Sequence, residues 1–152
     1  MHPWLHFKTI TRHKLLVMKY CFRIGLYKQG LLHDLSKYSP TEFLVGCRYY
    51  QGTRSPNNAE REDIGVSMPR KYVAEMVVDR ISASRNYLGD AYDDSQPLDY
   101  FLKSKEKLWF IHPQTKKELE ALLRILNDHG EKKLLHYIKY RYLRGETRKI
   151  KY

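Results

Sequence analysis

Apolar residues recur at helical spacing along most of the 152-residue chain, and short polar stretches containing glycine or proline separate them. No segment alternates apolar and polar positions with the period of two that a half-buried strand requires. The pattern predicts an all-α fold, a single-domain helical bundle over 1–152 with a basic tail from about 145 to 152. The expected helices are a long one over 11–28, a short one carrying His33 and Asp34, and others over 40–51, 69–88, 97–102, 115–129 and 131–144.

The first long helix is predicted to be largely buried and to stop at Gly30, because apolar residues occur nearly all round it. His13 falls on one stripe of this helix with Val17, Tyr20 and Ile24. That position directs the imidazole of His13 inward from the first turn. A partly exposed ring near the start of the helix is the alternative.

The helix over 69–88 has two distinct faces. Pro69 opens it and Gly89 follows its end, which are common start and stop signals. One face is a stripe that is predicted to pack in the core, made of Val73, Met76, Val77, Ile81, Ser84 and Leu88. The other is a polar stripe made of Tyr72, Glu75, Asp79, Ser82 and Asn86. Asp79 is therefore either an ordinary exposed acid or a side chain that faces a polar cavity.

The stretch from Gly30 to Lys37 places an imidazole, His33, next to a carboxylate, Asp34. A neutral imidazole nitrogen and a carboxylate oxygen can bind the same divalent ion. Together with His13 and Asp79 they would supply two nitrogen and two carboxylate ligands. Such a mixed set suits one divalent ion, which could be Fe, Mn, Co, Zn or Mg.

The predicted catalytic residues are Asp34 and Lys37, since Lys37 lies about one helical turn after Asp34. An ammonium group beside a phosphoryl group stabilises the charge that develops there. The alternative is a lysine at a helix end in solvent. His112, which precedes Pro113 at a helix boundary, is a second candidate for substrate binding, and its alternative is a local turn.

The order His13, His33-Asp34, Asp79 resembles the HD-domain superfamily of metal-dependent phosphohydrolases, and His33-Asp34-Leu35-Ser36-Lys37 is similar to the His-Asp-x-x-Lys form in several of its branches. The resemblance implies a helical bundle whose four matching residues bind a metal ion. It also implies a nucleotide or other small phosphoester as substrate. More closely, four stretches, residues 30–52, 54–56, 69–89 and 111–115, resemble a family of uncharacterised bacterial and phage proteins.

The chain departs from that closer family at one point. Its members carry a helical insert with clustered histidines between the positions that match Gly65 and Met68, whereas here the two are separated only by Val66-Ser67. In two-metal HD enzymes, histidines from such a region supply a second ion or contact the phosphate. The resemblance therefore implies at most one metal ion here, and a weakened or inactive enzyme is an alternative.

The net charge of +11 is concentrated at the two ends of the chain. Residues 1–29 contain six Lys/Arg and no acid, and residues 131–152 contain eight Lys/Arg and two acids. Basic ends favour contact with phosphates, either on a substrate or on nucleic acid, although a solvated surface has the same composition. The alternative function is thus a non-catalytic module that binds nucleic acid or a protein partner. Its candidate residues are Tyr137, Tyr140, Tyr142 and Tyr152, interleaved with Lys139, Arg141, Arg144 and Arg148. The alternative is that Tyr137 and Tyr140 pack on the bundle.

Composition restricts the class of protein further. Hydrophobic residues make up 42% of the chain and aromatic residues 13%, which is typical of a packed core. No stretch is long and apolar enough to span a membrane, and the start of the chain lacks the order of a signal peptide. Cys21 and Cys47 lie in apolar settings without a CxxC spacing, as free thiols in a reducing compartment do. We therefore expect a cytoplasmic protein without membrane contact. The sequence makes no prediction of its oligomeric state.

Overall fold

The computed structural model describes residues 3–33, 68–108 and 111–145, and every regular element among them is helical. The predicted all-α class is therefore confirmed. The α-helices are α1 (Pro3–Arg23), α2 (Tyr27–Leu32), α4 (Arg70–Leu88), α5 (Gln96–Ser104), α6 (Pro113–His129) and α7 (Glu131–Tyr137). Short 3-10 turns occur at η3 (Gly89–Ala91) and η4 (Lys105–Lys107), and a π-helical turn, η5 (Ile138–Tyr142), continues α7.

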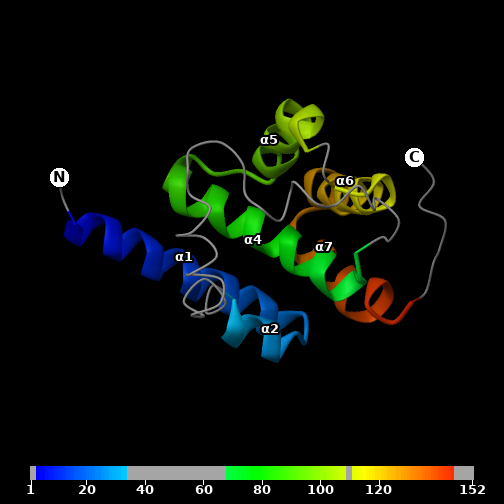
Figure 1. The fold of residues 1–152 in the computed structure, drawn as a ribbon, viewed down its shortest axis with the longest axis horizontal. Coiled ribbons are helices and arrows are strands. Elements are labelled where there is room, and N and C mark those ends of the chain that lie inside the picture. The colour runs from blue at the N-terminus through cyan, green and yellow to red at the C-terminus, as the bar shows by residue number, and fades with distance from the viewer. Residues whose placement is uncertain (1–2, 34–67, 109–110, 146–152) are drawn as a thin grey trace, which may run out of the picture.

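Helix α4 is central, because it packs against α1, α5 and α6 (Figure 1). It begins directly after Pro69 and ends at Gly89, whose φ of 53° lies in the left-handed region. Both predicted boundaries are confirmed. Helices α1 and α4 run antiparallel, since Thr9 of α1 contacts Asn86 and His13 contacts Asp79.

The prediction of one helix over 11–28 is wrong at both ends. Helix α1 starts at Pro3 and ends at Arg23, and Gly25, with a φ of 84°, turns the chain into the separate helix α2. Proline at the start of a helix leaves no hydrogen bond unsatisfied, which explains the early beginning. The left-handed backbone at Gly25 explains the early end.

Gly30 does not stop a helix as predicted, because it lies inside α2 and is buried. A Cβ atom at this position would lie 2.9 Å from Cβ of Cys21 on α1. The glycine therefore permits the close packing of α2 on α1. Helix α2 ends at Leu32, so the predicted short helix does not include His33, whose backbone has φ −55° and ψ 129°. Asp34 lies outside the described residues.

The core is formed by side chains of α1, α4, α5, α6 and α7, and nearly all of its members are aliphatic. Tyr20 and Tyr142 are buried at its border, and their hydroxyls donate to carboxylates of Glu131 and Glu118. The largest fully buried side chains are Phe101, Ile24, Ile81, Leu119, Leu122, Leu123, Leu126, Leu134, Ile138, Val17, Val73 and Val77. The sequence pattern correctly predicts Val73, Val77 and Ile81 as the packing stripe of α4, but Leu88, at its end, is exposed.

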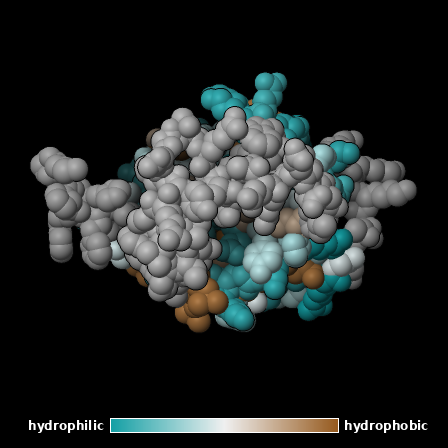
Figure 2. Space-filling view, in the orientation of Figure 1, coloured by the Kyte–Doolittle hydropathy of each residue, from teal (hydrophilic) through white to brown (hydrophobic). Residues whose placement is uncertain are grey.

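The surface mixes hydrophilic residues with small, separate groups of hydrophobic ones on the face drawn in Figure 2. Among the described residues, no helix combines the length and the apolar content that crossing a bilayer would need. Cys21 is a buried free thiol, as predicted, and Cys47 lies outside the described residues.

Candidate metal centre

Three of the four predicted metal ligands meet in one cluster, which consists of His13, His33 and Asp79. One potential ligand atom from each lies within 4.8 Å of the other two. Oδ1 of Asp79 is 2.9 Å from Nε2 of His13 and 3.2 Å from Nε2 of His33. The centroids of the two imidazole rings are 6.1 Å apart. Two nitrogens and a carboxylate oxygen therefore face one small volume.

The buried stripe of α1 places His13 in this cluster. Val17, Tyr20 and Ile24, which share the stripe, are all buried against the core. His13 lies one turn before them, where the contact between α1 and α4 reaches the surface, and it is partly buried. The predicted inward direction of the ring agrees with this position.

The polar stripe of α4 forms the contact with α1 and with His33. Asn86 donates from Nδ2 to the backbone oxygen of Thr9, and Asp79 pairs with His13 about two turns earlier along α4. Glu75, a further turn toward the start of α4, contacts His33. Asp79 is thus the member of a polar seam and not an isolated exposed acid, although 42% of its side chain remains accessible.

Glu75 is a functional candidate that the metal prediction does not include. Its Oε1 lies 2.9 Å from Nδ1 of His33, while Nε2 of the same ring faces Asp79. A carboxylate that accepts the Nδ1 proton leaves Nε2 as the metal-binding nitrogen and fixes the orientation of the ring. The available signal was spacing, because Glu75 is four residues before Asp79 on the same polar stripe.

The electrostatic environment keeps Asp79 ionised. Burial by itself would raise the pKa of its carboxyl, but hydrogen bonds from His13 and His33, together with their charges, hold that pKa well below its usual range. An ionised carboxylate is the form that binds a metal ion. The carboxylate of Asp79 is thus ready for a cation, and a bound ion would take the place of the protons on its two imidazole partners.

The other predicted site residues are Asp34, Lys37 and His112. Asp34 and Lys37 lie outside the described residues. His112 is the N-cap of α6, where its Nδ1 accepts a hydrogen bond from the backbone of Gln114. That contact corresponds to the local turn considered as its alternative, and a substrate contact of His112 stays a prediction.

The chain belongs to a family of unknown function, DUF5662, which matches it over residues 2–67 and 60–125. The two matched segments overlap over residues 60–67, the stretch that contains Gly65. All the cluster residues lie inside the matched segments. Comparison with curated proteins and with solved structures gave no match.

Proposed function

We propose that this member of DUF5662 binds one divalent metal ion with His13, His33 and Asp79 and hydrolyses a small phosphoester. The observation that carries the proposal is the convergence of these three side chains from α1, the residue after α2, and α4. Asp34, which directly follows His33, is the proposed fourth ligand. The proposed activity accords with the HD-domain resemblance of the same residues.

The donor set suits such an ion chemically. Imidazole nitrogen and carboxylate oxygen bind Fe, Mn, Co and Zn, and carboxylate also binds Mg. When bound, a divalent ion lowers the pKa of coordinated water and polarises a phosphoryl oxygen. The contact between Glu75 and Nδ1 of His33 is the orienting carboxylate that metal-binding histidines commonly have.

The protein residues have separate proposed tasks in the reaction. Hydrolysis adds the oxygen of water to phosphorus, breaks the P–O bond to the organic group, and releases an alcohol and inorganic phosphate. His13, His33 and Asp79 hold the ion, and Glu75 keeps the His33 ring in place. Lys37, as predicted from its spacing to Asp34, neutralises charge on the phosphoryl oxygens.

The proposal is tested by the metal content of full-length protein purified without a histidine tag or chelator. We expect close to one divalent ion per chain, and a large loss in His13→Ala and in His33→Ala. His129→Ala is the matched control, since it removes an exposed imidazole at the end of α6. Equal metal content in all four proteins, or no metal in any of them after supply of the five ions, would overturn the site. A screen of phosphoesters with the loaded protein then tests hydrolysis.

One surface favours a second candidate function, the binding of single-stranded nucleic acid. A shallow hollow on α7 and η5 is lined by Lys132, Lys133, His136, Tyr137 and Arg141. Beside it the exposed ring of Tyr140 lies against His136, with centroids 4.7 Å apart and the ring planes tilted by 45°. Bases stack on exposed aromatic rings while basic side chains contact phosphates.

The structure narrows the residues available for this second function. Tyr142 is buried and donates to Glu118, so its predicted role in stacking is wrong. Tyr152 and Arg148 lie outside the described residues. Binding of a short oligonucleotide should fall steeply with added salt and weaken in the double variant Lys132→Ala/Lys133→Ala. The matched pair Lys103→Ala/Lys107→Ala changes the same charge elsewhere, and equal binding by both pairs would reject the surface.

A further inference from the structure

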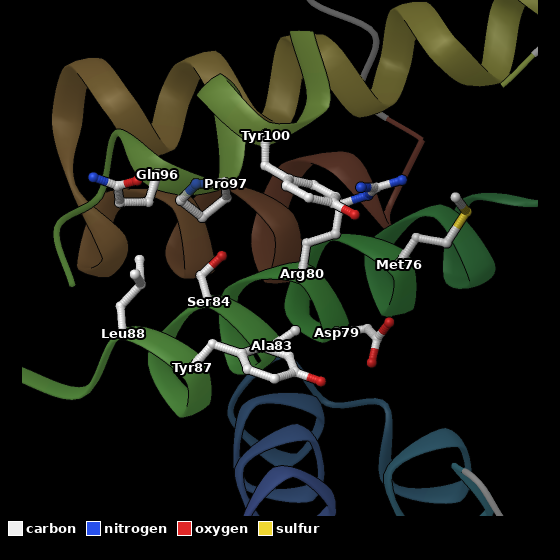
Figure 3. Close-up of a pocket in the computed structure, with 10 residues that line it drawn as sticks. All are labelled: Met76, Asp79, Arg80, Ala83, Ser84, Tyr87, Leu88, Gln96, Pro97 and Tyr100. Atoms are coloured by element: carbon white, nitrogen blue, oxygen red, sulfur yellow. The ribbon is translucent and has the colours of Figure 1, made fainter. Parts of the chain in front are cut away.

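A hollow of about 540 Å³ lies between α4 and α5, directly beside the metal cluster (Figure 3). Its walls are mainly apolar, and its volume is in the range of small-molecule sites, roughly 300–1,000 Å³. The residues that line it are Met76, Asp79, Arg80, Ala83, Ser84, Tyr87, Leu88, Gln96, Pro97 and Tyr100. Neither the predicted ligands nor the family match assigns a role to this hollow.

Asp79 connects the hollow to the cluster, because its carboxylate lines the hollow and also pairs with His13 and His33. In Figure 3, Asp79 and Arg80 lie toward one end, and Leu88 and Gln96 lie at the other. A ligand in this space would therefore have one end next to the metal cluster and the other end among apolar side chains.

Arg80 is the unusual charge in this hollow. Arg23 and Arg85 pair with the carboxylate of Glu131. In the described part of the chain no such ion pair involves Arg80, whose guanidinium lies over the ring of Phe101, 5.7 Å from its centroid. The side chain of Arg80 is partly buried. A partly buried cation without an ion pair gains free energy from an anionic ligand.

Two tyrosines border the same hollow and expose most of their surface. Tyr87 of α4 is 82% exposed and Tyr100 of α5 is 67% exposed. Together with the apolar walls they form a continuous exposed patch, and such patches mark ligand-binding grooves or interaction sites. Their faces suit stacking with a flat aromatic ring, and their hydroxyls suit its polar edge.

We propose that this hollow is the substrate pocket, in which Arg80 binds the phosphate and the tyrosine-bordered remainder takes a flat aromatic group. The inference rests on the proposed phosphohydrolase function and narrows its substrate class to phosphomonoesters of aryl or nucleoside groups. Water adds to phosphorus and the P–O bond to the organic group breaks, so that a phenol or a nucleoside leaves from the apolar end and inorganic phosphate from the Arg80 end. Aliphatic phosphoesters lack the stacking contact and bind less well.

The test measures binding of three probes to the full-length protein as purified, with and without chelator. The probes are phenyl phosphate, adenosine monophosphate and glycerol phosphate, and titration calorimetry gives their dissociation constants. The two aromatic probes should bind about tenfold or more tightly than the aliphatic one. Whichever of phenyl phosphate and adenosine monophosphate binds more tightly indicates whether the substrate carries an aryl or a nucleoside group. Equal binding of all three overturns the inference.

Substitutions then locate the binding. Arg80→Gln should weaken the aromatic phosphates about tenfold or more, whereas Arg80→Lys retains part of the affinity. Tyr100→Ala should weaken the aromatic probes alone, and Tyr100→Phe should restore them. Arg124→Gln, on α6, is the control for charge. Unchanged affinity in Arg80→Gln and Tyr100→Ala would place the ligand elsewhere.

The design separates this inference from the metal proposal. Binding that persists with chelator supports the pocket even if the protein contains no metal. Metal content that stays normal in Arg80→Gln shows that the variant has not disturbed Asp79. If metal content is normal but the aromatic probes bind no more tightly than glycerol phosphate, the metal centre is supported and the pocket is rejected.

Discussion

Glu75 and His33 form the contact that orients the proposed metal centre, with Oε1 of the carboxylate 2.9 Å from Nδ1 of the ring. The opposite ring nitrogen, Nε2, lies 3.2 Å from Asp79. His33 is thus held between two carboxylates of α4, one turn apart, although it follows a different helix. This arrangement connects the residue after α2 to α4 and explains why the ring has a defined direction.

Replacing Glu75 should weaken metal binding without removing a ligand. Loss of an orienting carboxylate typically reduces metal affinity by roughly 10–100-fold. Glu75→Gln retains an oxygen that accepts the Nδ1 proton, so its loss should be smaller than that of Glu75→Ala. Competition with a chelator of known affinity measures both. Glu106→Gln, an exposed glutamate of η4, is the control, and equal affinity in Glu75→Ala would reject the orienting role.

Metal should also stabilise the fold, because the cluster joins α1, α4 and the residue after α2. A ligand that binds only the folded state at a hundred times its dissociation constant adds about 2.7 kcal/mol. For a chain of this length that is a rise in Tm of roughly 5–10 °C. Thermal melts with and without metal check this rise. His13→Ala should show little of it, while His129→Ala should match the parent protein.

The sequence predicts helix boundaries where a residue type restricts the backbone, and it predicts the direction of a side chain where apolar residues form a stripe along a helix. Pro69 precedes the first residue of α4 and Gly89 follows the last, as predicted. Proline has no N–H to donate to a preceding turn, so a helix tends to begin beside it, and glycine accepts the positive φ at a helix end. The stripe through Val17 likewise predicts the direction of His13. Helical periodicity alone therefore indicates the direction of His13, but it leaves Asp79 open between an exposed acid and a side chain that faces a polar cavity.

What escaped prediction depends on contacts between elements. Gly25 and Gly30 look alike in sequence, yet Gly25 ends a helix, and Gly30 is inside one because Cys21 packs against it. The sequence shows Glu75 only as a member of the polar stripe, because its partner His33 is distant in the sequence. The hollow beside Arg80 depends on the position of α5 over α4, which no local pattern contains.

Gly30→Ala should destabilise the protein and disturb the metal centre together. The new Cβ would lie 2.9 Å from Cβ of Cys21, so α2 must shift away from α1. Overpacking of this kind costs about 1–3 kcal/mol. Because His33 follows α2 directly, metal affinity should fall as well. Lys28→Ala, an exposed position of the same helix, controls for helix propensity. Denaturant unfolding and metal titration measure the two effects, and full stability in Gly30→Ala would contradict this packing.

Glu131, at the start of α7, bonds to residues of α1 and α4 and should contribute to the free energy of unfolding. Its carboxylate accepts hydrogen bonds from the hydroxyl of Tyr20 at 3.0 Å and from the guanidinium of Arg85 at 2.5 Å. Glu131→Gln should cost about 1–3 kcal/mol in urea unfolding, since these partly buried donors lose a charged acceptor. Arg23→Gln removes a more exposed partner and should cost less than about 1 kcal/mol. A larger loss of unfolding free energy in Arg23→Gln than in Glu131→Gln would contradict this assignment.

Cys21 should be inert to thiol reagents in the folded protein. Burial, followed by the negative charges of Glu75 and Asp79, raises the pKa of its thiol to about 12. The unfolded thiol ionises near its ordinary value of 9.0, so the unfolded state releases its proton first as pH rises. Stability should therefore be unaffected below about pH 8 and decrease between pH 9 and 12. In a Cys47→Ser background, a disulfide reagent at pH 8 should react only after denaturant is added. Rapid reaction of the native protein would show that Cys21 is accessible, and an unchanged unfolding free energy from pH 8 to 11 would show that its ionisation is not coupled to folding.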